Sequence, residues 1–551
     1  TLASPGASGS LGANKALVID GVVPTVSNVT SFVSDGSFKI NDVIPITVTF
    51  TEAVTVSGTP QLTLETGSSD AVVNYASGSG STTLTFYYSV AAGHVSSDLD
   101  YASTSALALN SGTINDAAGN AATLTLASPG ASGSLGANKA LVLDGVVATV
   151  SSVTSTTADG SYKINTTIPI KVTFSEAVYV TGTPQLTLET GSSDAVVNYT
   201  SGSGSADLIF NYTVASGHTS SDLDYTSTSA LALNSGTIKD VVGNTSTLTL
   251  ASPGGTNSLG ANKALIIDTT VPTVASVTST SSDGSYKVGD VIPIKITFSE
   301  AVTVSGTPQL TLETGSSDAV VNYTSGSGSA DLIFNYTVAE GHLSSDLAYG
   351  STSALALNSG TINDAASNAA TLTLASPGAS NSLSNSKALV IDGVIPTVSS
   401  VTSATSNGTH KLGDVIAITV SFSETMTVTG TPQLTLETGS SDAAVNYASG
   451  SGSSTLTFNY TIGAGEASSD LDYASTSALA LNGGTIKDGA GNAATLTLAS
   501  PGATNSLGAN KALVVDGIVP TVSSVTSTTS NGSYKVDEVI AITVTFSEAV
   551  T

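Results

Sequence analysis

The stretch Ile168-Pro169-Ile170-Lys171-Val172-Thr173-Phe174-Ser175-Glu176 alternates apolar with polar residues. Successive side chains of a β-strand point to opposite faces, so the apolar residues at positions 168, 170, 172 and 174 share one face. This pattern predicts a strand with one buried face. Pro169 has no N–H to give to a neighbouring strand, so we expect it, like Pro45 and Pro293, to face outward on a sheet edge or to lie at a bulge.

Six similar stretches surround this one and are separated by clusters of Gly, Ser, Asn and Asp, which are turn-forming residues. They cover residues 149–155, 185–189, 196–199, 208–214, 230–238 and 264–267. No helical periodicity of comparable length accompanies them. Seven short strands predict an all-β fold of the immunoglobulin-like sandwich type. The step Asp224-Tyr225 fits either a tyrosine corner or a simple core tyrosine.

The segment Ala16-Leu17-Val18-Ile19-Asp20 returns as Ala140-Leu141-Val142-Leu143-Asp144, a step of 144 − 20 = 124 residues, and returns three times more. This period is too long for a solenoid unit and suits one complete β-domain. The sequence therefore predicts a tandem array of immunoglobulin-like repeats at 21–144, 145–268, 269–392 and 393–516. Residues 1–20 match the closing strands of a preceding repeat and 517–551 the opening strands of a following one, so we expect the natural protein to continue in both directions.

Composition narrows the possible partners. The 551 residues carry a net charge of −27 and contain no cysteine, which excludes disulfides and thiol chemistry. No basic cluster interrupts the acidic surface, so nucleic acids and anionic membrane surfaces are unsuitable partners and multivalent cations are suitable ones. No stretch approaches the roughly 20 apolar residues that a membrane helix requires.

Strand order predicts that acidic residues gather at one end of each repeat. Consecutive antiparallel strands end at opposite poles, so Glu176 after the second strand, the loop Asp240-Val241-Val242-Gly243-Asn244 after the sixth, and Asp144 in the incoming linker should meet. The equivalent positions complete the predicted sets: Asp20, Glu52, Asp116 and Asn120; Asp144, Glu176, Asp240 and Asn244; Asp268, Glu300, Asp364 and Asn368; Asp392, Glu424, Asp488 and Asn492; and, in part, Asp516 and Glu548.

Two interpretations of these sets remain open at this point. Oxygen-rich, histidine-poor clusters suit a hard cation, and Ca²⁺ tolerates the irregular geometry that a domain junction supplies. Alternatively, the Asp and Asn residues form turns and the Glu is a solvated strand end. The first interpretation makes Ca²⁺ a cofactor of every junction.

Catalytic constellations are poor. His218-Thr219-Ser220-Ser221-Asp222 contains the residue types of a hydrolytic triad, but converging loops assemble triads in space and this is one short turn. The position of His218 holds Glu466 in the fourth repeat. We therefore expect no enzymatic activity.

The sequence resembles the bacterial immunoglobulin-like repeats of giant surface adhesins, including biofilm-associated proteins. Three motifs carry the resemblance: Asp268-Thr269-Thr270-Val271-Pro272-Thr273, Phe298-Ser299-Glu300-Ala301-Val302 and Asp240-Val241-Val242-Gly243-Asn244. Ala148 replaces the linker proline in one repeat, and Ser367 replaces the loop glycine in another. The resemblance implies a secreted, cell-surface rod stiffened by calcium at its junctions, as in the similar cadherins, with Asp144, Glu176 and Asp240 as the corresponding ligands.

Three function classes are compatible with the sequence: an adhesin stalk, a self-assembling filament or surface-layer subunit, and a carbohydrate-binding module. The partners expected for the first two are neighbouring repeats and other copies of the chain. Sugar sites usually present exposed aromatic platforms, and the absence of Trp weighs against the third class. An exposed strand edge that recurs every 124 residues would favour the filament.

Overall fold

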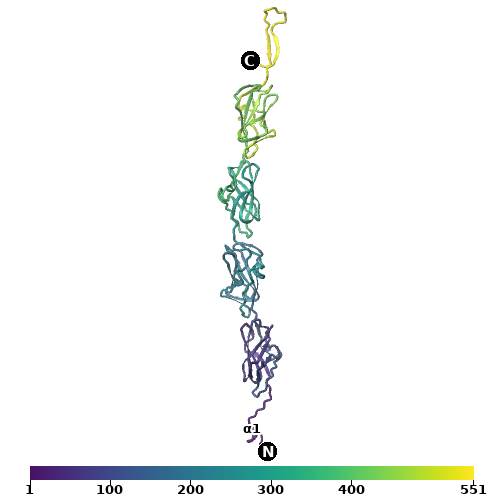
Figure 1. Cartoon of the computed structure of the whole chain (residues 1–551), viewed down its shortest axis with the longest axis vertical. Helices are drawn as coiled ribbons and strands as arrows, with labels where there is room; N and C mark the ends of the chain where they lie inside the picture. The colour runs from purple at the N-terminus through teal and green to yellow at the C-terminus, as the bar shows by residue number, and fades with distance from the viewer. The chain divides into compact units, whose positions relative to one another are not determined.

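The computed structural model describes all 551 residues as a chain of β-rich bodies (Figure 1). It forms two compact units, Thr1–Thr270 and Val271–Thr551. Four separate hydrophobic cores are present, and each draws its residues from a single 124-residue stretch of the repeat pattern. The structure thus confirms the predicted fold class, a tandem array of immunoglobulin-like β-sandwiches.

The second repeat serves as the reference for the others. Its elements are β11 (Val150–Ser155), β12 (Gly160–Tyr162), β13 (Thr167–Thr181), β14 (Gln185–Leu188), β15 (Ala195–Ser201), β16 (Ser205–Thr213), β17 (Thr219–Ser220), β18 (Leu231–Ala232), β19 (Thr237–Lys239), α3 (Leu259–Asn262) and β20 (Leu265–Asp268). One sheet has the order β11-β13-β16-β15-β14-β18, with β19 paired to β13, and a smaller sheet has the order β12-β20-β17.

The other repeats follow the same plan. The first has β1 (Val26–Ser31), β2 (Gly36–Lys39), β3 (Val43–Ser57), β4 (Gln61–Leu64), β5 (Ala71–Ser77), β6 (Ser81–Ser89), β7 (Val95–Ser96), β8 (Leu107–Ala108), β9 (Thr113–Asn115), α2 (Leu135–Asn138) and β10 (Leu141–Asp144). The third has β21 (Val274–Ser279), β22 (Gly284–Lys287), β23 (Val291–Ser305), β24 (Gln309–Glu313), β25 (Ala319–Ser325), β26 (Ser329–Thr337), β27 (Leu343–Ser344), β28 (Ala348–Tyr349), β29 (Leu355–Ala356), β30 (Thr361–Asn363), α4 (Leu383–Ser386) and β31 (Leu389–Asp392).

The fourth repeat has β32 (Val398–Ser403), β33 (Gly408–Lys411), β34 (Val415–Thr429), β35 (Gln433–Leu436), β36 (Ala443–Ser449), β37 (Ser453–Thr461), β38 (Ala467–Ser468), β39 (Leu479–Ala480), β40 (Thr485–Lys487), α5 (Leu507–Asn510) and β41 (Leu513–Asp516). The chain ends contribute α1 (Leu11–Asn14), β42 (Val522–Ser527) and β43 (Ile542–Phe546). No helix has the length and apolar character that crossing a membrane requires.

The core lies between two layers of strands, and a single series of paired strands supplies both layers. Strand β15 pairs with β14 as far as Asn198 and with β16 only from Tyr199 onward, so it passes from one layer to the other. Leu186 of β14 and Phe210 of β16 then belong to one core and are fully buried. The alternating residues 168, 170, 172 and 174 of β13 face this core, as their spacing predicts.

The structure corrects several details of the sequence prediction. The second strand does not end near Phe174 but continues to Thr181, and the predicted segment 230–238 is two short strands, β18 and β19. Three further elements are too short to show a hydrophobic period in the sequence: the strands β12 and β17 and the one-turn helix α3. Helix α3 forms because Ser258 caps it, its side chain accepting from the N–H of Ala261.

Pro169 lies inside β13, not on an outer strand. Pro169 pairs with Asn211 of β16. The pairing with β11 reaches only Ile170, the residue after the proline, so Pro169 has no partner in β11. Ser155 Oγ donates to the Pro169 carbonyl on the β11 side, the side where a proline lacks its N–H. In the fourth repeat Ala417 takes the place of the proline, and its N–H donates to Thr405 Oγ1. The proline therefore occupies a local edge within a central strand.

Tyr225 is a core tyrosine with a distant partner. It is 1% exposed, and its hydroxyl donates to the carbonyl of Ala251, 26 residues downstream, at 2.7 Å. A tyrosine corner would bond to the backbone a few residues upstream, so the simple core interpretation holds. Tyr101, Tyr349 and Tyr473 make the equivalent bond.

We expect Tyr225→Phe to destabilise the second repeat by about 1 kcal/mol, because the Ala251 carbonyl loses its partner while the ring stays packed. Hydrogen exchange followed by mass spectrometry on peptides from residues 145–268 measures the change in local opening. The control is Tyr179→Phe in the same repeat, which alters a half-exposed ring. Equal effects of the two variants would contradict a structural role for the Tyr225 hydroxyl.

Candidate metal centre

Glu176 lies at a break in the pairing of the long strand β13. The strand pairs with β16 as far as Thr173 and resumes at Val178, and its last residues pair with β19. At the break, Ser175 N donates to Thr149 O at 2.8 Å and Thr149 N donates to Ser175 Oγ at 3.0 Å. These bonds tie the residue before Glu176 to the start of the repeat, next to the incoming linker.

Asp240 follows directly after β19 and builds the loop that faces Glu176. Its Oδ1 accepts from the N–H groups of Val242, Gly243 and Asn244 at 3.0, 2.7 and 2.8 Å. Its Oδ2 accepts from Asn244 Nδ2 at 2.7 Å. Asp240 is 2% exposed, and Gly243 adopts φ +99°, which favours glycine. This is the turn-forming role that the second interpretation assigned to the Asp and Asn residues.

Asp144 enters from the preceding repeat. It ends β10, whose last residue pairs with Val95, and its Oδ1 accepts from Val146 N at 3.2 Å. Asn244 Nδ2 donates to the Asp144 carbonyl at 2.9 Å. The main chain of Asp144 is thus held against the loop of the following repeat, at the end of the repeat that the strand order predicts.

The carboxylates come close together at the entries to the first and the fourth repeats. In the first repeat, Asp20, Glu52 and Asp116 each offer an oxygen within 4.8 Å of the others, and Asp392, Glu424 and Asp488 do the same at the junction to the fourth repeat. Asp116 and Asp488 are also buried, and each forms in its own repeat the same kind of Asx turn that Asp240 forms. The remaining predicted residues occupy equivalent places within their own units: Asp268 ends β20, Asp516 ends β41, Glu300 lies in β23, and Asp364 and Asn368 lie in the loop after β30.

In the first, second and fourth repeats, the Glu is the member of the set whose charge is least compensated. Oε1 of Glu52, Glu176, Glu424 and Glu548 is buried and accepts no hydrogen bond. Burial, followed by the charges of Asp392 and Asp488, raises the pKa of Glu424. The pKa of Glu176 is raised in the same way, first by burial and then by the charges of Asp144 and Asp240. For Asp116, burial opposes ionisation, but hydrogen bonds from Asn120 and its neighbours outweigh it and lower the pKa.

This donor set fits a hard divalent cation. A buried carboxylate oxygen without a hydrogen-bond donor, beside two further carboxylates, supplies ligand atoms of the type that Ca²⁺ prefers. The predicted Asn ligands differ from the carboxylates, because the Oδ1 atoms of Asn244 and Asn492 each accept a backbone N–H from the preceding repeat. No sequence signal marks those donors, Ile40 and Val288, because they act through the main chain.

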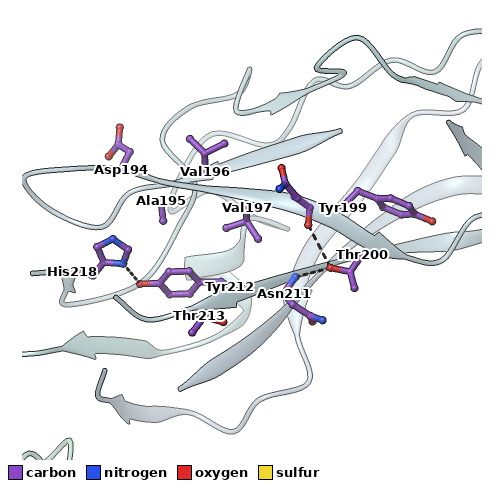
Figure 2. A pocket seen from close by; sticks show the side chains of 11 residues that line it. Asp194, Ala195, Val196, Val197, Tyr199, Thr200, Asn211, Tyr212, Thr213 and His218 are labelled. Atoms are coloured by element: carbon purple, nitrogen blue, oxygen red, sulfur yellow. Dashed lines mark hydrogen bonds between the residues drawn. The ribbon is translucent and has the colours of Figure 1, made fainter. Parts of the chain in front are cut away.

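His218 braces a loop beside a second feature, a hollow of about 700 Å³ between β15 and β16. Figure 2 shows the Tyr212 hydroxyl directed at His218, with 2.9 Å between the oxygen and Nδ1. Nδ1 also accepts from Ala215 N at 3.3 Å, so this nitrogen faces the loop. In the fourth repeat Glu466 Oε2 accepts from both Tyr460 Oη and Gly463 N. The exchange of His for Glu preserves an acceptor that holds the loop.

The hollow offers no aromatic platform. Figure 2 shows Tyr199 turned away from the other lining residues. Its hydroxyl accepts from Ser203 N, and its ring meets Phe210 edge to face. Tyr212 is 1% exposed and stacks on His218. Neither ring is available to stack on a sugar, which weighs against a carbohydrate-binding module.

Comparisons with known proteins give a limited result. No family model matches the chain, and no curated protein matches it. Among solved structures, an I-band fragment of titin is similar over 58% of this chain and 89% of its own, with 8% sequence identity and a TM-score of 0.20. The immunoglobulin-like assignment rests on the strand order and the cores described above.

The raised pKa of Glu424 predicts a pH-dependent stability in EDTA. A group with a higher pKa in the folded than in the unfolded chain stabilises the fold below the unfolded pKa and loses that contribution as pH rises through the folded pKa. We therefore expect Glu424→Gln to raise the melting temperature at pH 7 and to have a smaller effect towards pH 4.5, the ordinary pKa of Glu.

Differential scanning calorimetry of the full chain in EDTA measures this difference. The control is Glu437→Gln, an exposed Glu of the same repeat. A Glu424→Gln effect that stays constant across this pH range would show that the carboxylate charge is not the cause.

Proposed function

We propose that this chain is a stalk segment of a secreted bacterial surface adhesin, in which Ca²⁺ stiffens the junctions between immunoglobulin-like repeats. Its role is to hold an adhesive region away from the cell, in cell adhesion or biofilm formation. The observation that carries the proposal is the buried Glu424 oxygen, which accepts no hydrogen bond and lies beside the carboxylates of Asp392 and Asp488 at the junction to the fourth repeat.

Electrostatics gives the cation a mechanical role. At an effective dielectric of about 20, two full charges about 4 Å apart repel by about 4 kcal/mol. Asp392 comes from the incoming linker, whereas Glu424 and Asp488 belong to the fourth repeat. Their mutual repulsion therefore pushes the linker away from the repeat it enters. A divalent cation held by the three carboxylates reverses this force.

The expected affinity suits an extracellular setting. Extracellular Ca²⁺ modules bind at about 10⁻⁴ to 10⁻³ M, so millimolar calcium stabilises a site at the tighter end by about 1.4 kcal/mol. One such contribution is small, but the set recurs along the chain. The acidic, cysteine-free composition and the separate core of each repeat support the same role.

Calcium titration of the full chain tests the proposal. We expect binding heat in isothermal titration calorimetry, a higher melting temperature, and a longer maximum dimension in small-angle scattering when Ca²⁺ replaces EDTA. Glu424→Gln combined with Asp488→Asn should remove about one site's share of the heat, because both changes delete carboxylate ligands of one junction.

The matched control combines Glu437→Gln with Asp442→Asn, which makes the same chemical changes at exposed positions of the same repeat. If the wild type shows none of these responses up to about 10 mM Ca²⁺, well above the affinities of extracellular sites, the calcium proposal is wrong. The acidic residues would then be turn formers, and a stalk without metal would remain.

A further inference from the structure

We infer that Asn244 and Asn492, which end the loops that begin at Asp240 and Asp488, are latches that fix the preceding repeat, separate from the carboxylate cluster. The interaction surface pairs each loop with the turn at residues 39–42 of the preceding repeat, or 287–290 at the later junction. The inference rests on the proposed function in one respect, since a stalk must resist bending where its repeats join.

The same bond occurs in both compact units. Ile40 N donates to Asn244 Oδ1 at 2.9 Å across 204 residues, and Val288 N donates to Asn492 Oδ1 at 2.9 Å across the same separation. The aliphatic chain of Lys39 also lies against the loop, since a Cβ added at Gly243 would be 3.6 Å from Lys39 Cδ. Gly491 and Lys287 repeat this contact at 3.6 Å.

Asn244 is held ready for its partner. It is 4% exposed, and Nδ2 donates to Asp240 Oδ2 and to the Asp144 carbonyl. These bonds turn Oδ1 towards the preceding repeat. A buried amide oxygen without a donor costs free energy, so the loop is complete only when Ile40 supplies its N–H. The loop is therefore shaped for a main-chain donor.

The donor turn is equally ordered. Lys39 N donates to Asp42 Oδ2 at 3.0 Å, and Lys39 Nζ pairs with Asp42 Oδ1 at 3.0 Å. Asn41 has φ 71°, and its N–H donates to Val90 O at 2.9 Å. Lys287 and Asp290 form the same pair, with Gly289 at φ 87° in the place of Asn41. Ile40 and Val288 thus present their N–H groups from fixed turns.

The linker between the two surfaces is short and held at both ends. Gly145 N donates to His94 O at 2.7 Å, and Gly93 N donates to Gly145 O at 2.8 Å. Ala148 is fully buried, and its carbonyl accepts from Thr247 N at 2.9 Å. Between these points, the Val146 N–H donates to Asp144 Oδ1 at 3.2 Å, and the Val146 carbonyl accepts from Asn244 Nδ2 at 3.4 Å, so the latch residue also restrains the linker.

Spin labels across two junctions test the inference in the full chain, which has no native cysteine. Val72→Cys with Val196→Cys reports on the first junction, and Val320→Cys with Ala444→Cys reports on the later one, all at exposed strand positions. Ile40→Pro deletes the donor of the first latch, and Val288→Pro deletes that of the second, because proline has no N–H.

In EDTA, each proline variant should broaden the electron–electron distance distribution of its own label pair and leave the other unchanged. The open population should rise about fivefold, which corresponds to the loss of about 1 kcal/mol. Asn244→Ala, which deletes the acceptor, should broaden the first pair as Ile40→Pro does. The Asn244→Ala variant still tests the latch if the proline of Ile40→Pro disturbs the turn at residues 39–42.

Unchanged distributions in both Ile40→Pro and Asn244→Ala, or equal broadening of both label pairs, would overturn the latch. Adding Ca²⁺ separates this result from the proposed function. If calcium has no effect while the latch variants broaden their own pairs, the calcium proposal fails alone. If calcium narrows the distributions while the latch variants match the wild type, the latch fails alone.

Discussion

The entry to each repeat depends on one long strand that changes its pairing partners along its length. Strand β13 pairs with β11 and β16 in its first half and with β19 in its second, and the pairing breaks between Thr173 and Val178. At the break, the Ser175 N–H and hydroxyl bond to the main chain of Thr149, at the entry to the repeat. It also carries the strand to β19, whose next residue is Asp240. Glu176, the linker and the acidic loop therefore lie at the same end of the repeat, where the strand changes partner.

The sequence predicts this arrangement only in part. Alternation identifies the buried face at 168–174, and strand order brings Asp144, Glu176 and Asp240 to one end. The continuation to Thr181 also has a signal in the sequence: Val178 and Val180 keep the spacing of the apolar positions, and Glu176 occupies the inward position between Phe174 and Val178. An acidic residue at an inward-facing position of a strand predicts a buried carboxylate, and the overall acidic composition does not. The bond between Ile40 and Asn244 has no local pattern, because it joins main chain to side chain across separate repeats.

The hydrogen bonds distinguish the two roles that acidic residues play here. Asp240 is buried, yet its oxygens accept four hydrogen bonds within the loop, so its charge is solvated by the protein. Glu176 Oε1 has no such donor, and burial with two neighbouring carboxylates raises its pKa. A buried carboxylate whose negative charge is not compensated destabilises the fold when it is ionised, unless a cation lies beside it. Turn formation accounts for the Asp and Asn residues and leaves the Glu unexplained, which is why the Glu carries the metal hypothesis.

Asp240 links the carboxylate cluster to the contact between repeats. One of its oxygens builds the turn, and the other orients Asn244, whose own oxygen receives the Ile40 N–H. A displacement of Asp240 towards or away from Glu176 therefore moves the acceptor that the preceding repeat uses. Since the same Asn244 amide also donates to the Asp144 and Val146 carbonyls, four bonds meet on one buried side chain. The carboxylates set the charge of the junction, and the Asn244 amide sets its geometry. The two are coupled through the two hydrogen bonds that Asn244 donates to Asp240.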